Sequence, residues 1–428
     1  MWSDIRKNLL YLISGNAVAS IGGVFLTTLV INIFGLEMLG NLAIAQAAVF
    51  TAYGLFNLHT WQALIKFGGS FYESSRWDTF NQYVNYSRFL DFISGVLSFF
   101  ILNLVIWTLY KYEIVPSLLM EIVVTLSFYL LFNLNNSSIG VIRLFGLYKN
   151  IAIQANLSVA LKLTFCFFVF SLELSFKWLV FFILISDVFA NIYIYVCSRK
   201  SITNRYKRSR TKNIENSKVS IEYRKFFKFC MWLNVGGIID LPLKQLDVVI
   251  LSFFLSSHVI GVFKFTKQIS KIVSQIADPV YQIFYPIFTR EVDSSSLGFR
   301  KVLNISFGIF FVGMSALLSV YFFYDWAVVN FFSKDLVDFK YVIISYLFSN
   351  VLIVSSICIH PMFIAKGFVK YNAFINLASN SVYLAIIMFT SIYDSLYVAV
   401  LAFLIQGLLK IVSKMIIIYQ YENNKVLN

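Results

Sequence analysis

Residues 92–110 read FISGVLSFFILNLVIWTLY, a run of mainly Phe, Leu, Ile and Val without a charged side chain. A helix needs roughly 20 mainly apolar residues to cross about 30 Å of hydrocarbon at 1.5 Å per residue. The run has this length, and it lacks the strict alternation of polar and apolar residues seen in the strands of membrane barrels. It therefore predicts a membrane-spanning helix.

The rest of the chain has the same character. Of its 428 residues 59% are hydrophobic and 13% are charged, and the mean hydropathy is +0.76. These values exclude an ordinary soluble domain. The expected fold class is therefore all-α and integral to the membrane.

Apolar runs separated by polar breaks predict about 12 transmembrane helices in two six-helix lobes. An N-lobe is expected over 1–197, a basic cytoplasmic linker over 198–225 and a C-lobe over 226–428. The expected spans are 9–34, 39–58, 89–110, 117–137, 151–172, 176–197, 226–255, 258–289, 299–324, 336–363, 372–393 and 395–420.

Lys and Arg orient these spans, because cytoplasmic loops collect basic residues. With the N-terminus inside, most of the 35 basic residues fall on the cytoplasmic side, and the largest group lies in the linker. We therefore expect both termini in the cytoplasm. The net charge of +14 is a topology signal that requires no nucleic-acid partner, although the linker could also attract anionic membrane lipids.

The two halves share an internal repeat, as in many transporters. Gly40 and Gly261 open corresponding helices. Three further pairs have the same separation in sequence: Gly146 and Gly367, Lys149 and Lys370, and Ala152 and Ala373. Two halves of equal orientation are expected to be related by a pseudo-two-fold axis along the membrane normal.

Ionisable residues inside spans are costly and mark functional candidates. Span eight carries Lys264, Lys267 and Lys271 on one helical face, and Lys244 lies in span seven. We interpret these lysines as the cationic lining of a substrate cavity that attracts a phosphate-bearing headgroup. The alternative is structural pairing, or snorkelling toward the membrane interface.

Three carboxylates accompany the lysines. Asp240 and Asp247 flank Lys244, and Asp278 follows further along span eight. They are candidates for ion coupling or for ion pairs, and both interpretations stay open. Pro242 breaks the helix between Asp240 and Asp247. Such a break is typical either of an ion site or of a simple kink. Lys162 and Asp187, in spans five and six, are expected to pair with each other.

Other chemistry has no motif in this sequence. No GxxxxGK[ST], HExxH or nucleophile elbow occurs, so neither an enzyme nor a cofactor is expected. The cysteines are interpreted as small buried residues rather than metal ligands. The isolated histidines receive no role: His59, His258 and His360.

The stretch from Asp247 to Glu291, DVVILSFFLSSHVIGVFKFTKQISKIVSQIADPVYQIFYPIFTRE, resembles the middle of Wzx-type O-antigen flippases of the multidrug/oligosaccharidyl-lipid/polysaccharide (MOP) superfamily. That family has an Asp ending span seven, a Gly-x-Tyr-x-x-Ala motif opening span eight, and a Pro before a basic end. The matching positions here are Asp247, Gly261, Phe263, Thr266, Pro286 and Arg290. Phe263 and Thr266 stand where the family has Tyr and Ala.

The resemblance implies a flippase of the bacterial inner membrane. It would export an undecaprenyl-pyrophosphate-linked oligosaccharide from the cytoplasmic to the periplasmic leaflet by alternating access. Coupling to a proton or sodium ion, and cooperation with polysaccharide polymerase machinery, are implied with it. The pyrophosphate would give the lysine stripe its anionic partner.

Two alternatives remain open. A drug exporter of the same superfamily would favour a cavity rich in carboxylates and aromatic rings. A polysaccharide polymerase would be expected to carry a large external loop with catalytic residues. The longest expected loops, near 59–88 and 198–225, both fall on the cytoplasmic side, which favours a transporter.

Overall fold

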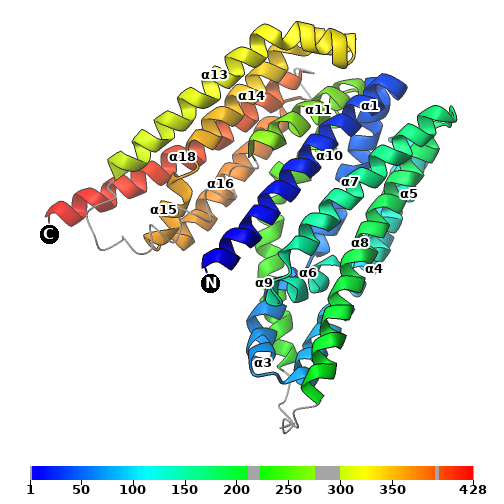
Figure 1. The fold of residues 1–428 in the computed structure, drawn as a ribbon. Helices are drawn as coiled ribbons and strands as arrows, with labels where there is room; N and C mark the ends of the chain where they lie inside the picture. Colours follow the sequence, from blue (N-terminus) through cyan, green and yellow to red (C-terminus); the bar gives the residue numbers. More distant parts are fainter. Residues whose placement is uncertain (1, 211–221, 275–298, 391–394, 428) are drawn as a thin grey trace. The chain divides into compact units, whose positions relative to one another are not determined.

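The computed structural model describes the chain except residues 1, 211–221, 275–298, 391–394 and 428. Within the described residues the chain is helical and contains no strand. Figure 1 draws the described helices, coloured in chain order.

In the first half the helices are α1 (Trp2–Phe56), α2 (Thr60–Ala63), η1 (Leu64–Gly68), α3 (Gly69–Glu73), α4 (Trp77–Lys111), α5 (Ser117–Ser127), η2 (Phe128–Phe132), α6 (Asn135–Leu144), α7 (Tyr148–Ser171) and α8 (Phe176–Arg210). In the second half they are α9 (Tyr223–Ile239), η3 (Pro242–Leu246), α10 (Asp247–Leu251), α11 (Ser257–Ser274), α13 (Phe299–Phe331), η4 (Lys334–Phe339), α14 (Lys340–Ser355), α15 (Ile359–Ala365), α16 (Val369–Met388) and α18 (Leu396–Leu427).

Seven helical segments in the described part are long and apolar enough to cross a membrane, and up to nine if each of two bent helix pairs counts as one span. One bent pair is Ser117–Phe132 with Asn135–Leu144, and the other is Tyr223–Ile239 with Pro242–Leu251. The chain is therefore a multi-pass membrane protein. The expected span 258–289 lies partly outside the described residues.

Local sequence explains where the helices break. Gly35 has φ 84° and ψ 169° and separates the two expected spans that share α1, a conformation that glycine adopts without steric cost. Pro242 begins the π-helical turn η3, as its missing N–H requires a break. The expected single span 117–137 is instead interrupted at residues 133–134, beside a cluster of asparagines.

One expectation about loops was wrong. Much of segment 59–88, expected as a cytoplasmic loop, is helical: it forms α2, η1, α3 and the start of α4. Its aromatic side chains pack into a core with α6 and α9. Buried members of that core include Trp77, Phe80 and Phe226. Burial of these rings provides the stabilisation that a long apolar run provides elsewhere.

Contacts group the chain into two compact units. The N-terminal unit comprises Met1–Gly22 and Ala45–Leu241, and the C-terminal unit comprises Gly23–Ile44 and Pro242–Asn428. Segment 23–44 thus groups with the second half of the chain, and 226–241 groups with the first. The lobe and linker boundaries expected from the sequence stay a prediction.

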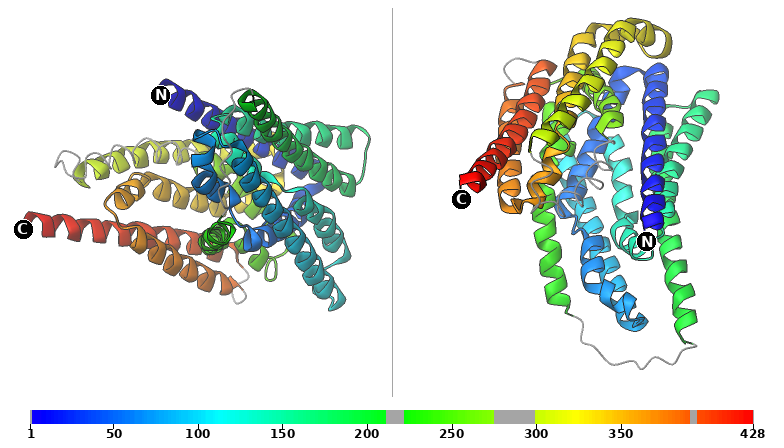
Figure 2. Two further views of the ribbon diagram at one scale, coloured as in Figure 1. Left: turned by 90° about the horizontal axis from the view of Figure 1, so that it is seen from below. Right: turned by 60° about the vertical axis from the view of Figure 1, so that its left-hand side comes forward.

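Within the N-terminal unit, α7 and α8 pack along each other (Figure 1). The expected pair between them is confirmed, since Lys162 Nζ lies 2.6 Å from Asp187 Oδ1. Within the C-terminal unit, α14 and α16 each pack on α18, and α11 and α13 pack on α14 (Figure 2). Helices α14 and α18 of this group form two walls of the cavity described next.

Candidate substrate site

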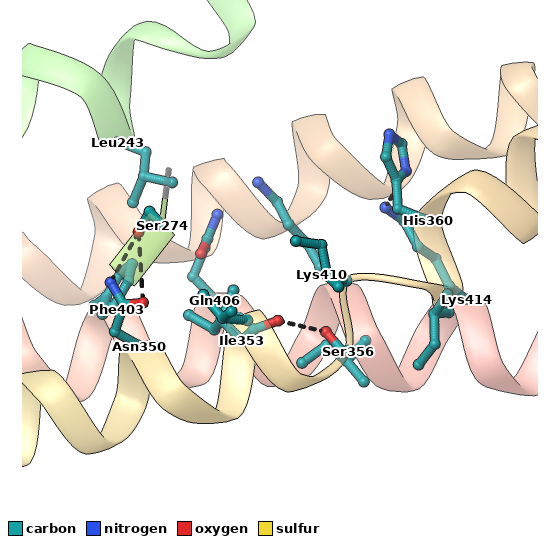
Figure 3. A pocket seen from close by; sticks show the side chains of 15 residues that line it. Leu243, Ser274, Asn350, Ile353, Ser356, His360, Phe403, Gln406, Lys410 and Lys414 are labelled. Carbon is teal, nitrogen blue, oxygen red and sulfur yellow. Dashed lines mark hydrogen bonds between the residues drawn. The ribbon is translucent and has the colours of Figure 1, made fainter. Parts of the chain in front are cut away.

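A cavity of about 590 Å³ lies within the C-terminal unit. Its walls come from α14, α15, α18 and the turn between the first two, with Leu243 of η3 and Ser274 of α11 at one end (Figure 3). The volume falls in the range of small-molecule sites in proteins. Much of the lining is apolar, including Ile353 and Phe403.

Helix α18 supplies three polar side chains to the cavity: Gln406, Lys410 and Lys414. A spacing of four residues places them on one face of the helix, and they leave it on the same side (Figure 3). Lys414 is 8% exposed. Its Nζ lies 3.1 Å from His360 Nδ1 of α15 and 5.9 Å from the centre of the Phe363 ring.

Neutral polar groups continue the lining beyond the lysines. Asn350 Nδ2 donates to Ser274 Oγ at 3.1 Å, which joins α14 to α11 at the cavity end (Figure 3). Gln406 Nε2 donates to Asn380 Oδ1 of α16 at 2.9 Å. Ser356 Oγ donates to the Ile353 carbonyl at 2.7 Å. These hydrogen bonds fix the polar side chains in place.

The electrostatics of the cavity favour an anion. None of its described lining residues is an Asp or a Glu. Lys410 and Lys414, one turn apart on α18, repel each other, and desolvation adds to the cost because Lys414 is buried. A bound anion with several oxygens would offset both costs. The arrangement can therefore bind a phosphate or pyrophosphate group.

The lysines expected in the cavity lie elsewhere. Lys267 on α11 forms a salt bridge with Asp247, with Nζ to Oδ2 at 2.7 Å. Asp247 is 1% exposed, and its Oδ2 also accepts a hydrogen bond from the Tyr383 hydroxyl at 3.0 Å. Lys267 Nζ further contacts the carbonyl of Leu243, in the π-helical turn, at 3.3 Å. The structure thus pairs Asp247 with Lys267.

The remaining expected site residues are not brought together at this cavity. Lys264 and Lys271 on α11, Lys244 in η3 and Asp240 at the end of α9 are absent from its described lining. Asp278 lies outside the described residues, as do Pro286 and Arg290 of the flippase-like motif. A role for these residues stays a prediction.

Sequence reasoning missed the lysines that do line the cavity. Counting basic residues by side of the membrane places Lys410 and Lys414 with the cytoplasmic charges near the C-terminus, whereas α18, which continues to Leu427, carries both into the cavity lining. The spacing of Gln406, Lys410 and Lys414 within an apolar run was the available signal. Sequence reasoning assigns no role to His360 because its partner, Lys414, lies far away in the sequence.

No protein-family model and no curated protein matches this chain. Solved structures do match it. A multidrug resistance MATE family transporter of the MOP superfamily, in an inward-facing conformation, is 14% identical, with 97% of this chain and 96% of that chain covered and a TM-score of 0.64. A MOP superfamily transporter from Pyrococcus furiosus is 13% identical, with 96% of both chains covered and a TM-score of 0.64.

A third similar structure is the lipid II flippase MurJ in an inward closed conformation. It is 14% identical, with 95% of this chain and 87% of that chain covered and a TM-score of 0.66. The likeness extends over nearly the whole chain in all three comparisons. The expected all-α fold of about 12 transmembrane helices is thereby confirmed, and the chain has the fold of the transporters of the MOP superfamily.

Proposed function

We propose that this protein is a flippase that exports a polyprenyl-pyrophosphate-linked oligosaccharide, an O-antigen or related polysaccharide repeat unit, across a bacterial inner membrane. The observation that carries the proposal is the cavity with Lys410, Lys414 and His360 and no acidic residue in its described lining. Ammonium groups bind phosphate as point charges, and low-dielectric walls strengthen the attraction. The similarity to a lipid II flippase supports a lipid-linked cargo.

In the proposed cycle the cargo enters from the cytoplasmic leaflet and leaves to the periplasmic one by alternating access. Its diphosphate neutralises the lysines of α18, and the neutral groups, such as Gln406 and Asn350, offer hydrogen bonds to the first sugars. An ion gradient, of protons or sodium, drives the cycle. Both termini are in the cytoplasm, and polysaccharide polymerase machinery takes up the product.

A drug exporter is the second candidate, since multidrug transporters share this fold. Exporters of cationic drugs need carboxylates to attract their cargo, by the same Coulomb argument. The cavity offers two ammonium groups instead. This observation favours the anionic cargo.

The first test deletes the gene in its host and follows polyprenyl-pyrophosphate-linked repeat units on each side of the inner membrane. A flippase requires that single units accumulate on the cytoplasmic face while surface polymer disappears. Units that reach the periplasmic face without being polymerised would identify a polymerase. Normal polymer together with increased sensitivity to cationic drugs would identify a drug exporter.

A further inference from the structure

Helix α9 has two faces of different character. One face packs into the N-terminal unit: Phe226 and Cys230 are fully buried, and Asn234 Nδ2 donates to the Asn57 carbonyl at 2.8 Å. The other face carries a surface pocket of about 530 Å³ whose described lining comes from α9 alone. The lining residues are Arg224, Phe227, Lys228, Met231, Trp232 and Val235. None of them lines the cavity proposed for the cargo.

The two basic residues of this pocket lie at the start of the helix. Arg224 and Lys228 are one turn apart, so they share a face, and both are exposed. Among the described residues neither takes part in a salt bridge. Glu222 is paired with Lys225 instead, whose Nζ lies 2.6 Å from Glu222 Oε1. The two cations of the pocket are therefore open to an anion from outside the chain.

Large apolar side chains continue the face beyond the basic residues. Phe227, Met231 and Val235 are exposed, and Trp232 is 68% exposed. Helix α9 begins one of the bent helix pairs that can cross a membrane. Exposed apolar side chains on such a helix are stable against lipid chains, whereas contact with a water-filled passage would be unfavourable. This face therefore suits a ligand that approaches from the membrane.

The length of the face corresponds to one leaflet of a bilayer. A rise of 1.5 Å per residue places Val235 about 16 Å further along the helix than Arg224, which is roughly half the thickness of the hydrocarbon. A matching ligand carries an anion at the interface and an apolar chain below it. Arg offers paired N–H donors to phosphate oxygens, and Lys offers a point charge.

We propose that this face of α9 is a binding site for an anionic phospholipid. The phosphate lies between Arg224 and Lys228, and an acyl chain lies along Phe227, Met231 and Trp232. Basic residues near the membrane surface attract anionic headgroups over zwitterionic ones. A lipid-linked diphosphate shares this chemistry, but phospholipid is the anion that the surrounding leaflet supplies in bulk. The site does not depend on the proposed function.

The test uses the fluorescence of Trp232 in the full-length protein, reconstituted in phosphatidylcholine vesicles. Phosphatidylglycerol with brominated acyl chains, which quench tryptophan on contact, replaces increasing fractions of the phosphatidylcholine. Brominated phosphatidylcholine gives the reference series. The same series on Trp232→Phe isolates the contribution of Trp232 from that of the other tryptophans. We expect Trp232 to be quenched at a lower fraction of phosphatidylglycerol than of phosphatidylcholine.

Arg224→Gln and Lys228→Gln should each reduce this preference by about fivefold, the effect of one basic residue near an anionic surface. Lys225→Gln is the matched control. It removes the same charge from the same part of α9, but Lys225 lies outside the pocket and is paired with Glu222. The control should keep the preference of the wild type.

The thermal unfolding midpoint shows whether each variant is folded. If only one of the two pocket variants folds, its comparison with Lys225→Gln decides. If neither folds, unbrominated phosphatidylglycerol must relieve the quenching of the wild type more than unbrominated phosphatidylcholine does, or the proposal fails.

Four results would overturn the proposal. Equal quenching by the two brominated lipids would show that the headgroup is not recognised. An equal loss of preference in Lys225→Gln would show a general attraction to a basic surface. Absence of quenching of Trp232 by either lipid would show that protein, such as a second copy of the chain, covers this face. A prenyl diphosphate that relieves the quenching at a far lower fraction than phosphatidylglycerol would assign the site to the cargo.

Discussion

Gly40 and Gly261 lie backbone to backbone in the C-terminal unit, and neither position has room for a side chain. A Cβ atom on Gly40 would overlap the carbonyl oxygen of Ser257, and one on Gly261 would overlap the carbonyl oxygen of Leu36. The two glycines occupy equivalent positions of the internal repeat. The repeat therefore brings α1 and α11 together through a close approach that only glycine permits.

We expect Gly40→Ala and Gly261→Ala to lower the stability of the protein strongly, because the obstacle in each case is backbone rather than a movable side chain. Overpacking of this kind costs about 1–3 kcal/mol. The thermal unfolding midpoint of the purified variants measures the effect. Gly308→Ala in α13 is the matched control, since no atom lies within 4 Å of its added Cβ, and it should be neutral or slightly stabilising.

The repeat also predicts a pair of turns with the same geometry. Gly146 has φ 69° and Gly367 has φ 87°. Each ends a helix, and the N–H of each glycine donates to the carbonyl three residues earlier at 3.0 Å. Such left-handed C-terminal turns favour glycine, with asparagine next.

Gly146→Ala and Gly367→Ala should each destabilise the protein by about 1–2 kcal/mol, the penalty of a Cβ in the left-handed region. Asn at either position should cost less than Ala. Chemical or thermal unfolding of the purified variants ranks them. Equal effects of Ala and Asn would show that the conformation of this turn is not what requires glycine. Gly236→Ala, inside α9 with open space around it, should not destabilise.

The sequence predicted what depends on local pattern. Apolar runs located the spans, equal separation located the glycine pairs, and neighbouring spans suggested the pair of Lys162 with Asp187. Sequence patterns did not predict features that depend on contacts between residues far apart in the chain. Segment 59–88 has no long apolar run, so its helices could not be recognised before Trp77 and Phe80 were seen to share a core. Counting charges by loop assigned Lys414 to the membrane surface, although α18 carries it into a cavity.

Lys267 and Asp247 provide a test of buried ion pairing. Removing one partner of a buried pair leaves an uncompensated charge and costs about 3–5 kcal/mol. We therefore expect Lys267→Met and Asp247→Asn each to destabilise the protein strongly. The double variant should be much more stable than their sum predicts, because no charge is left unpaired. Thermal unfolding of the wild type, the two single variants and the double variant forms a double-mutant cycle, which gives the coupling free energy of the pair.

The control for that cycle is the pair of Lys340 with Asp325. Its Nζ to Oδ2 distance is also 2.7 Å, but Asp325 is exposed, so the same cycle should give a coupling of less than about 1 kcal/mol. If the Lys267 cycle gives no larger coupling than this one, the interpretation of Lys267 as a structural partner of Asp247 is wrong. The lysine would then be available for cargo, as the sequence analysis expected.

Lys410 and Lys414 decide whether the cavity binds an anion. Lys410→Gln and Lys414→Gln should each weaken binding of a short-chain prenyl-pyrophosphate sugar to the purified protein. A hydrogen bond to a charged group contributes about 1.5–3 kcal/mol, which corresponds to a tenfold or greater rise in Kd. Lys177→Gln removes a lysine that pairs with Glu121 on an exposed surface, so it should leave Kd unchanged.

Each cavity variant should also reduce the dependence of binding on salt, because one charge contact is lost. Unchanged Kd in both variants, with the protein folded, would exclude the cavity as the diphosphate site and return attention to Lys264 and Lys271 on α11.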